Sequence, residues 1–212
     1  TNLTASPVHV IKEDPHNENV LYLGTDNGAW VSFNRGDNWH VFSGGLPNVA
    51  VHDLVIQKRE KDLVLGTHGR SFYLADTEVL SKMSSGSMNE VIVADLGSIR
   101  SSGRWGSKFS PWYDIFEPSK DIQFYSPATG KAEVVVTDEN DNRLQRKVVD
   151  VERGINIVKY DLSISEKGVK ALGKSGTEIK KAENDLFYLP KGSYNITVSI
   201  DGKEAITTLE VK

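Results

Sequence analysis

An apolar segment that recurs within the first 80 residues constrains the fold more than any other feature. Residues 20–25 read VLYLGT and residues 62–67 read DLVLGT, a separation of 42 residues. The apolar stretch before each copy carries a histidine, His9 in the first and His52 in the second, 43 residues apart. A period of about 40 to 50 residues is typical of the four-stranded blades of β-propellers. The repeat therefore predicts two similar antiparallel sheets in residues 1–80.

Turn-forming residues divide the first repeat into four predicted strands, over residues 7–12, 19–25, 29–34 and 38–43. Asn27-Gly28 fits a two-residue hairpin, because glycine accepts the positive φ that such a turn requires. The second repeat shows only three strands before residues 77–80, as expected where a ring of blades closes with a strand from elsewhere. The predicted fold class is all-β, beginning with a partial β-propeller of two four-stranded blades, the second of them incomplete.

The turn after the third predicted strand reads SFNRGDNW at residues 32–39. It resembles the Asp-box, Ser/Thr-x-Asp-x-Gly-x-x-Trp, of sialidase-type and sortilin-type propellers. Ser32 and Asn34 would cap backbone amides, and Asn34 would do so without the charge of the usual aspartate. Gly36 would take the strained turn position, and Trp39 would pack between sheets. The resemblance implies a structural role for these four residues.

Residues 7–80 together resemble the end of the bacterial sortilin-like propeller proteins commonly labelled "glycosyl hydrolase, BNR repeat". The resemblance implies a secreted, periplasmic or cell-surface protein. Two blades alone leave sheet faces and edges unburied, and repeat folds need neighbours. We therefore expect upstream propeller blades, or another copy of the chain, as a partner.

Residues 81–118 are rich in serine and glycine and predict an irregular connector. Residues 91–96 predict a strand laid across the propeller edge. The connector also contains more aromatic side chains than a solvated tether needs, and we expect them to pack it between the domains: Trp105, Phe109, Trp112, Tyr113 and Phe116.

Residues 119–212 predict a β-sandwich of seven short strands, at 120–126, 131–138, 143–151, 154–162, 186–189, 192–200 and 203–211. This region resembles the Ig-like module that closes these propeller proteins and flagellar hook-assembly proteins. The resemblance implies a spacer or a docking surface. The lysine-rich insertion 163–185 predicts a solvated loop with one helical turn. The acidic stretch 138–142 fits a hairpin turn better than a calcium loop, because it lacks the spaced bidentate glutamate.

Composition excludes several classes of function. The 25 Lys and Arg residues against 29 Asp and Glu leave no basic excess for a phosphate backbone, so nucleic acid is not an expected partner. No run approaches the roughly 18 to 20 apolar residues that cross a bilayer. The absence of cysteine excludes disulfides and thiolate metal sites. No phosphate loop or zinc-helix motif is present, and we expect no cofactor.

Strand direction sorts the candidate site residues onto faces of the predicted propeller. The turn between the second and third strands of a blade shares a face with the loop between blades, here residues 44–48. This predicts a ligand face that contains Asp26, Asn27, His68 and Arg70. Arg70 would clamp a carboxylate of a ligand or pair with a neighbouring blade. His9 and His52, on the innermost strands, could approach the central channel; without a third ligand they predict packed histidines rather than a metal site.

No catalytic set can be assembled from this chain. A sialidase needs three arginines, an activated tyrosine nucleophile and an acid, and this chain cannot supply that set. A glycosidase pair cannot be chosen among the Asp and Glu residues without knowing the separation of their carboxylates. The first hypothesis is therefore a non-catalytic scaffold that binds a peptide or a glycan, with the sandwich as spacer. The alternative is a piece of a glycoside hydrolase whose catalytic residues lie in upstream blades.

Overall fold

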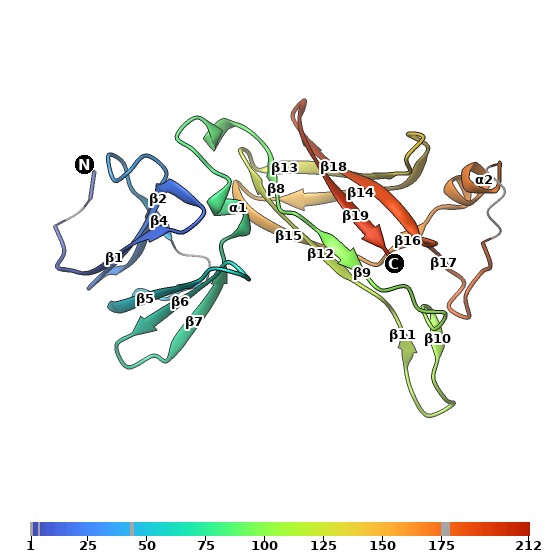
Figure 1. The fold of residues 1–212 in the computed structure, drawn as a ribbon, viewed down its shortest axis with the longest axis horizontal. Helices are drawn as coiled ribbons and strands as arrows, with labels where there is room; N and C mark the ends of the chain where they lie inside the picture. Colours follow the sequence, from blue (N-terminus) through green and yellow to red (C-terminus); the bar gives the residue numbers. More distant parts are fainter. Residues whose placement is uncertain (1, 4, 43–44, 175–178) are drawn as a thin grey trace. The chain divides into compact units, whose positions relative to one another are not determined.

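The computed structural model describes residues 2–3, 5–42, 45–174 and 179–212, and these fold almost entirely as β-strands. The chain divides into two compact units, Thr1–Asn89 and Glu90–Lys212 (Figure 1). The boundaries predicted after residues 80 and 118 stay a prediction. No helix among the described residues is long and apolar enough to cross a membrane.

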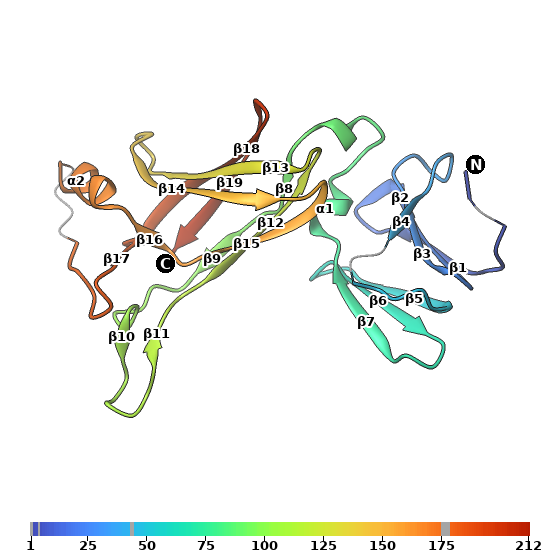
Figure 2. The same ribbon diagram turned by 180° about the vertical axis from the view of Figure 1, so that it is seen from behind.

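Two antiparallel sheets build the N-terminal unit, and each joins its strands in sequence order (Figures 1 and 2). The first contains β1 (Val8–Asp14), β2 (Asn17–Thr25), β3 (Gly28–Ser32) and β4 (His40–Phe42). The second contains β5 (Val51–Gln57), β6 (Asp62–Thr67) and β7 (Phe72–Asp76). The predicted strands, and the count of four and three, are therefore found within the described residues.

Alternation of side chains explains how the second sheet packs. Leu54, Leu63 and Leu65 are buried, and β5 contacts β1 and β2 of the first sheet. The helix α1 (Glu78–Ser81) follows β7 and buries Val79 and Leu80. On the opposite face Val55, Val64 and Leu74 lie in one cross-strand row. The first and last of these are 57% and 68% exposed, so an apolar face of the sheet is left uncovered.

The C-terminal unit contains two larger sheets that share one core. The five-stranded sheet has the order β14 (Arg143–Val151), β13 (Gly130–Thr137), β18 (Gly192–Ile200), β19 (Lys203–Val211) and β9 (Gly97–Ile99). The three-stranded sheet has the order β15 (Gly154–Tyr160), β12 (Lys120–Ser126) and β8 (Ile92–Val93). The seven strands predicted for residues 119–212 are all present, that at 186–189 only as the short β17 (Phe187–Tyr188), which pairs with β16 (Ser163–Ile164).

The segment predicted as an irregular connector is more ordered than expected. The strand predicted at residues 91–96 is β8, and it pairs with β12 of the C-terminal unit, so its placement across the propeller edge is wrong. Its apolar side chains explain the difference, because Val91, Val93 and Leu96 belong to the core of that unit. After the short helix η1 (Ser87–Asn89), the segment also supplies β9, β10 (Ser107–Lys108) and β11 (Ile115–Phe116).

The five aromatic residues of this segment divide into one core residue and four surface residues. Trp105 is 6% exposed and packs edge-to-face on Tyr188, with ring centroids 6.0 Å apart. The β10–β11 hairpin projects from the rest of its unit in Figure 1 and carries the other four, which are 56% to 93% exposed: Phe109, Trp112, Tyr113 and Phe116. The expectation that all five are packed is therefore wrong for these four.

The lysine-rich insertion forms a longer helix than the single turn predicted. Helix α2 (Glu166–Lys174) has nine residues, begins after Ser165 and contacts β14. The Ser165 hydroxyl accepts a hydrogen bond from the Gly168 amide at 3.1 Å, which is the N-cap arrangement that serine favours. Leu172 is buried, and Val169 packs against the core. Residues 175–178 lie outside the described residues.

Two glycines of α2 provide a test of its packing on β14. An added Cβ at Gly168 would lie 2.4 Å from the Leu144 carbonyl oxygen, whereas one at Gly173 would meet nothing within 4 Å. We expect Gly168→Ala to destabilise the C-terminal unit by roughly 1–3 kcal/mol, because the backbone of β14 at Leu144 must move to make room for the added methyl group. Gly173→Ala should stabilise it by roughly 0.5–1 kcal/mol through helix propensity. Urea unfolding measures both, and a stabilising Gly168→Ala would contradict this packing.

Candidate functional site

Equivalent histidines of the two repeats lie at equivalent irregularities of their sheets. Val8 pairs with Thr25 and Val10 with Gly24, so His9 between them has no partner across the ladder. His52 lies in the same position between Val51 and Asp53, which pair with Thr67 and Gly66. Each histidine is thus the extra residue of a β-bulge. Bulges re-aim a side chain and occur often beside functional sites.

The turn after the second strand of each sheet is repeated as well. The Asp26 amide donates to the Pro7 carbonyl at 3.2 Å, and the His68 amide donates to the Ala50 carbonyl at 2.9 Å. Asp26 and His68 are therefore equivalent residues, each the first after its strand. Each sheet therefore contributes two equivalent side chains to this part of the N-terminal unit, one from its bulge and one from the turn after its second strand.

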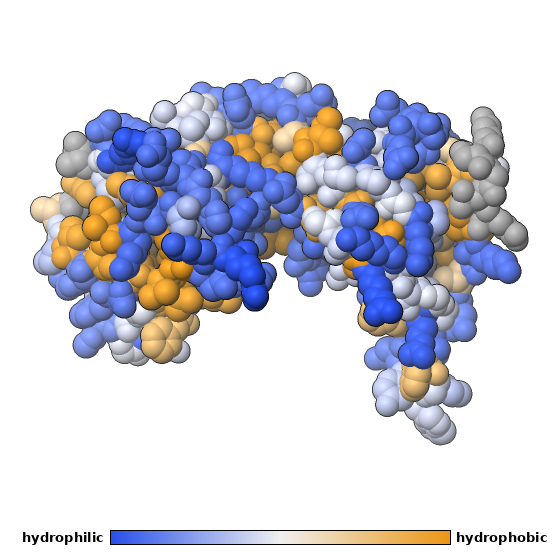
Figure 3. All heavy atoms as spheres, viewed as in Figure 1, coloured by the Kyte–Doolittle hydropathy of each residue, from blue (hydrophilic) through white to orange (hydrophobic). Residues whose placement is uncertain are grey.

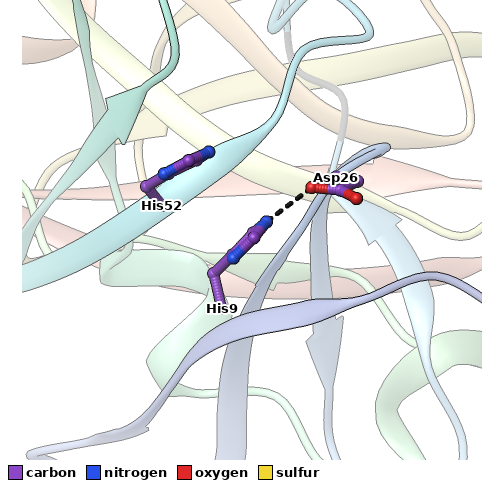
Figure 4. Close-up of side chains that lie close together, drawn as sticks. All are labelled: His9, Asp26 and His52. Atoms are coloured by element: carbon purple, nitrogen blue, oxygen red, sulfur yellow. Dashed lines mark hydrogen bonds and ion pairs between the residues drawn. The ribbon is translucent and has the colours of Figure 1, made fainter.

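The structure brings together residues that the sequence assigned to two different groups. His9 Nε2 lies 2.5 Å from Asp26 Oδ1, and the His9 and His52 rings stack with centroids 4.3 Å apart (Figure 4). The His68 ring also stacks on that of His52, with ring centroids 5.3 Å apart. We call these four residues the histidine row. Two of them were predicted for the ligand face and two for the channel.

A glycine lets the two sheets approach closely enough to form the histidine row. A Cβ added at Gly24 would lie 2.6 Å from the Val51 carbonyl oxygen and 2.7 Å from a methyl group of Val10. Such distances require the backbone of β5 to move. Since Val51 and Val10 are the chain neighbours of His52 and His9, a larger residue at position 24 would separate the two rings.

Two other predicted ligand-face residues do not join the row through any contact among the described residues. Asn27 donates from Nδ2 to the Ser6 hydroxyl at 3.2 Å. Arg70 is exposed, and its side chain makes no hydrogen bond or ion pair within the described part of the chain. The loop 44–48 begins outside the described residues, because Gly44 is not among them.

The Ser32–Trp39 turn has the hydrogen bonds expected of its sequence. The Ser32 hydroxyl accepts from the Gly36 amide at 2.9 Å, and Asn34 Oδ1 accepts from the Asn38 amide at 2.9 Å. Gly36 adopts a φ of 93°, and the ring of Trp39, 5% exposed, lies beside it. These contacts are internal to the turn and its strands, which supports a structural role for the motif.

Asp14 is a buried residue whose role the sequence analysis missed. Asp14 is 2% exposed, and its carboxylate accepts hydrogen bonds from the Tyr22 hydroxyl at 2.9 Å and the Ser81 hydroxyl at 2.8 Å. The amides of His16 and Asn17 donate to its other oxygen. Burial, followed by the Asp14 charge, raises the pKa of Tyr22 far above its usual range, so this hydroxyl remains a donor. The Asp-Pro-His-Asn turn predicts the two local bonds but not the two distant ones.

A hollow of about 880 Å³ lies in the other unit and contains none of the histidine row. Its walls come mainly from β19, with β9 and β18, and its lining residues include acidic Asp95, Glu139 and Glu210 and basic Lys212. A hollow of this volume without convergent chemistry is weaker evidence for a site than four side chains placed by a repeat.

Within the described residues no serine or threonine hydroxyl bonds to any imidazole of the histidine row. The row therefore offers hydrogen-bond donors and acceptors, metal-ligating nitrogens and one carboxylate, without an activated hydroxyl nucleophile of the serine-hydrolase kind. This chemistry suits recognition of a polar ligand or an ion.

Comparison with known proteins adds little to these observations. No protein-family description matches the chain, and no curated protein matches it. Two solved structures of the extracellular domain of BT4673 from B. thetaiotaomicron are similar, described as a one component system and a hybrid two component system. Each has 11% identity and a TM-score of 0.28, with 98% of this chain covered. The chain spans about a quarter of their length, 25%.

Proposed function

We propose that the chain is part of a secreted, non-catalytic propeller protein of the sortilin and sialidase type, which binds a peptide or a glycan through the histidine row. The proposal rests on a structural repeat. Each of the two sheets contributes one side chain from a bulge and one from a turn, and the residues in equivalent positions are 42 or 43 residues apart in the sequence. A blade architecture repeats side-chain positions in this way, and propellers bind ligands on the face where such turns gather.

The uncovered apolar face of the second sheet supports the blade interpretation. Val55, Val64 and Leu74 form a row, and Phe72 nearby is 77% exposed. Figure 3 shows apolar surface over this part of the N-terminal unit. In a propeller such a face packs on the next blade, so the proposed occupant is another sheet of the same repeat, from the rest of the protein or from another copy.

A tyrosine of the C-terminal unit supports an Ig-like sandwich that serves as a spacer. The Tyr194 hydroxyl, near the start of β18, donates to the Pro190 carbonyl at 2.8 Å. Ig-like folds carry a tyrosine corner in which a tyrosine bonds to backbone a few residues upstream. Burial first, and then the charges of Asp138 and Glu139, raise the pKa of Tyr194 to about 12, so this bond persists at physiological pH.

Binding to immobilised peptides and glycans tests the proposed function. We expect saturable binding to one of these ligand classes. The double variant Asp26→Ala/His52→Ala should weaken this binding at least about tenfold, because the ligand loses its charged contact with Asp26 and its polar contact with His52. The His40→Ala variant is the matched control, since His40 is an exposed histidine of the same unit outside the row. Release of the aryl group from aryl glycosides by the protein would instead support the glycoside hydrolase alternative.

A further inference from the structure

The structure assigns a zinc-class metal site to His9, Asp26 and His52, three residues of the histidine row. One ligand atom from each lies within 4.8 Å of the other two. The three come from different segments, two bulged strands and one turn, so their convergence results from the fold rather than from adjacency in sequence. This inference goes beyond the proposed binding of a peptide or glycan and does not depend on it.

Small side-chain rotations bring these atoms to metal-binding distances. Ligands at about 2.0 to 2.2 Å from a tetrahedral ion lie about 3.4 Å from one another. His9 Nε2 and Asp26 Oδ1 are 2.5 Å apart and must separate by about 1 Å, whereas one ligand atom of His52 lies within 4.8 Å of both. The side chains of His9 and Asp26 are 28% and 46% exposed, so solvent leaves them room to turn. Their backbone positions remain fixed by the bulged ladder and the turn.

The donor set selects the class of ion. Two imidazoles and one carboxylate suit zinc and the later divalent transition metals, whereas calcium and magnesium prefer oxygen ligands alone. Three protein ligands at an exposed position also leave coordination positions open. A site of this kind can hold water or a ligand atom as well as the ion.

Isothermal titration with Zn²⁺ and with Ca²⁺ at neutral pH tests the site on the full chain. We expect one Zn²⁺ to bind per chain and Ca²⁺ to bind at least about tenfold more weakly. His9→Ala, His52→Ala and Asp26→Asn should each weaken Zn²⁺ binding by at least about tenfold, since even loss of a residue that only orients a metal ligand costs about 10- to 100-fold. Asp26→Asn retains the size and the acceptor oxygen of Asp26 and should not disturb folding.

The His40→Ala variant serves again as control and should bind Zn²⁺ as the wild type does. Circular dichroism establishes that each variant is folded. Absence of Zn²⁺ binding by the wild type would overturn the site, and so would equal weakening by His40→Ala or unchanged binding by Asp26→Asn. Because this titration contains no peptide or glycan, its outcome is independent of the test of the proposed function.

Discussion

Replacing Trp105 by alanine should lower the free energy of unfolding of the C-terminal unit by about 3 to 5 kcal/mol, the usual cost of removing a buried tryptophan. Trp105 is 6% exposed and belongs to the core that both sheets share, and its ring packs on Tyr188. The truncation leaves a cavity beside Tyr188 of β17. Urea unfolding, with circular dichroism as the signal, measures the loss.

Trp112→Ala is the matched control, because Trp112 is 93% exposed on the β10–β11 hairpin. We expect it to change the free energy of unfolding by less than about 0.5 kcal/mol, as surface substitutions usually do. Comparable destabilisation by the two variants would show that the hairpin aromatics are packed after all.

Asp14→Ala should destabilise the N-terminal unit by about 3 kcal/mol or more, because it leaves buried hydroxyls without acceptors. Tyr22 and Ser81 would each lose a hydrogen bond, and the bonds to two backbone amides would also be lost. Since Ser81 ends α1, the helix would lose one of its attachments to the first sheet. Hydrogen exchange resolved by segment should show faster exchange across residues 8–81.

The exposed Asp37 provides the comparison for Asp14 in the same unit. Asp37→Ala should change stability by less than about 0.5 kcal/mol. If Asp14→Ala lowered the free energy of unfolding as little as Asp37→Ala does, the hydrogen bonds to Asp14 would contribute little to the stability of the N-terminal unit. That result would contradict the prediction.

Strand positions could be predicted from the sequence because alternating apolar residues and turn residues act locally. Asn27-Gly28 and the 42-residue repeat located β1 to β7, and the seven segments after residue 119 located the main strands of the other unit. Short elements were missed where the pattern is too brief to alternate, as in β9 and β16, which have three and two residues. Helix α2 had a usable signal in Ser165, followed by apolar Val169 and Leu172 at helical spacing.

The candidate site was only half predictable. His9, His52, Asp26 and His68 were each identified, but the sequence separated the strand residues from the turn residues. A bulge shifts the pairing by one residue, and an alternation pattern does not reveal it. Long-range hydrogen bonds had no signal either, so Asp14 appeared to be only a turn residue although it bonds to Ser81, 67 residues away.

The two equivalent bulges that hold His9 and His52 also bear on how such a surface can diversify. The same backbone irregularity recurs in both sheets. A substitution of the bulge residue in one sheet therefore changes one side chain of the histidine row and leaves the backbone of both sheets intact. A duplicated sheet would bring its own side chain to the neighbouring place in the row. The functional groups on this surface can therefore change one repeat at a time, while the strands that carry them keep their pairing.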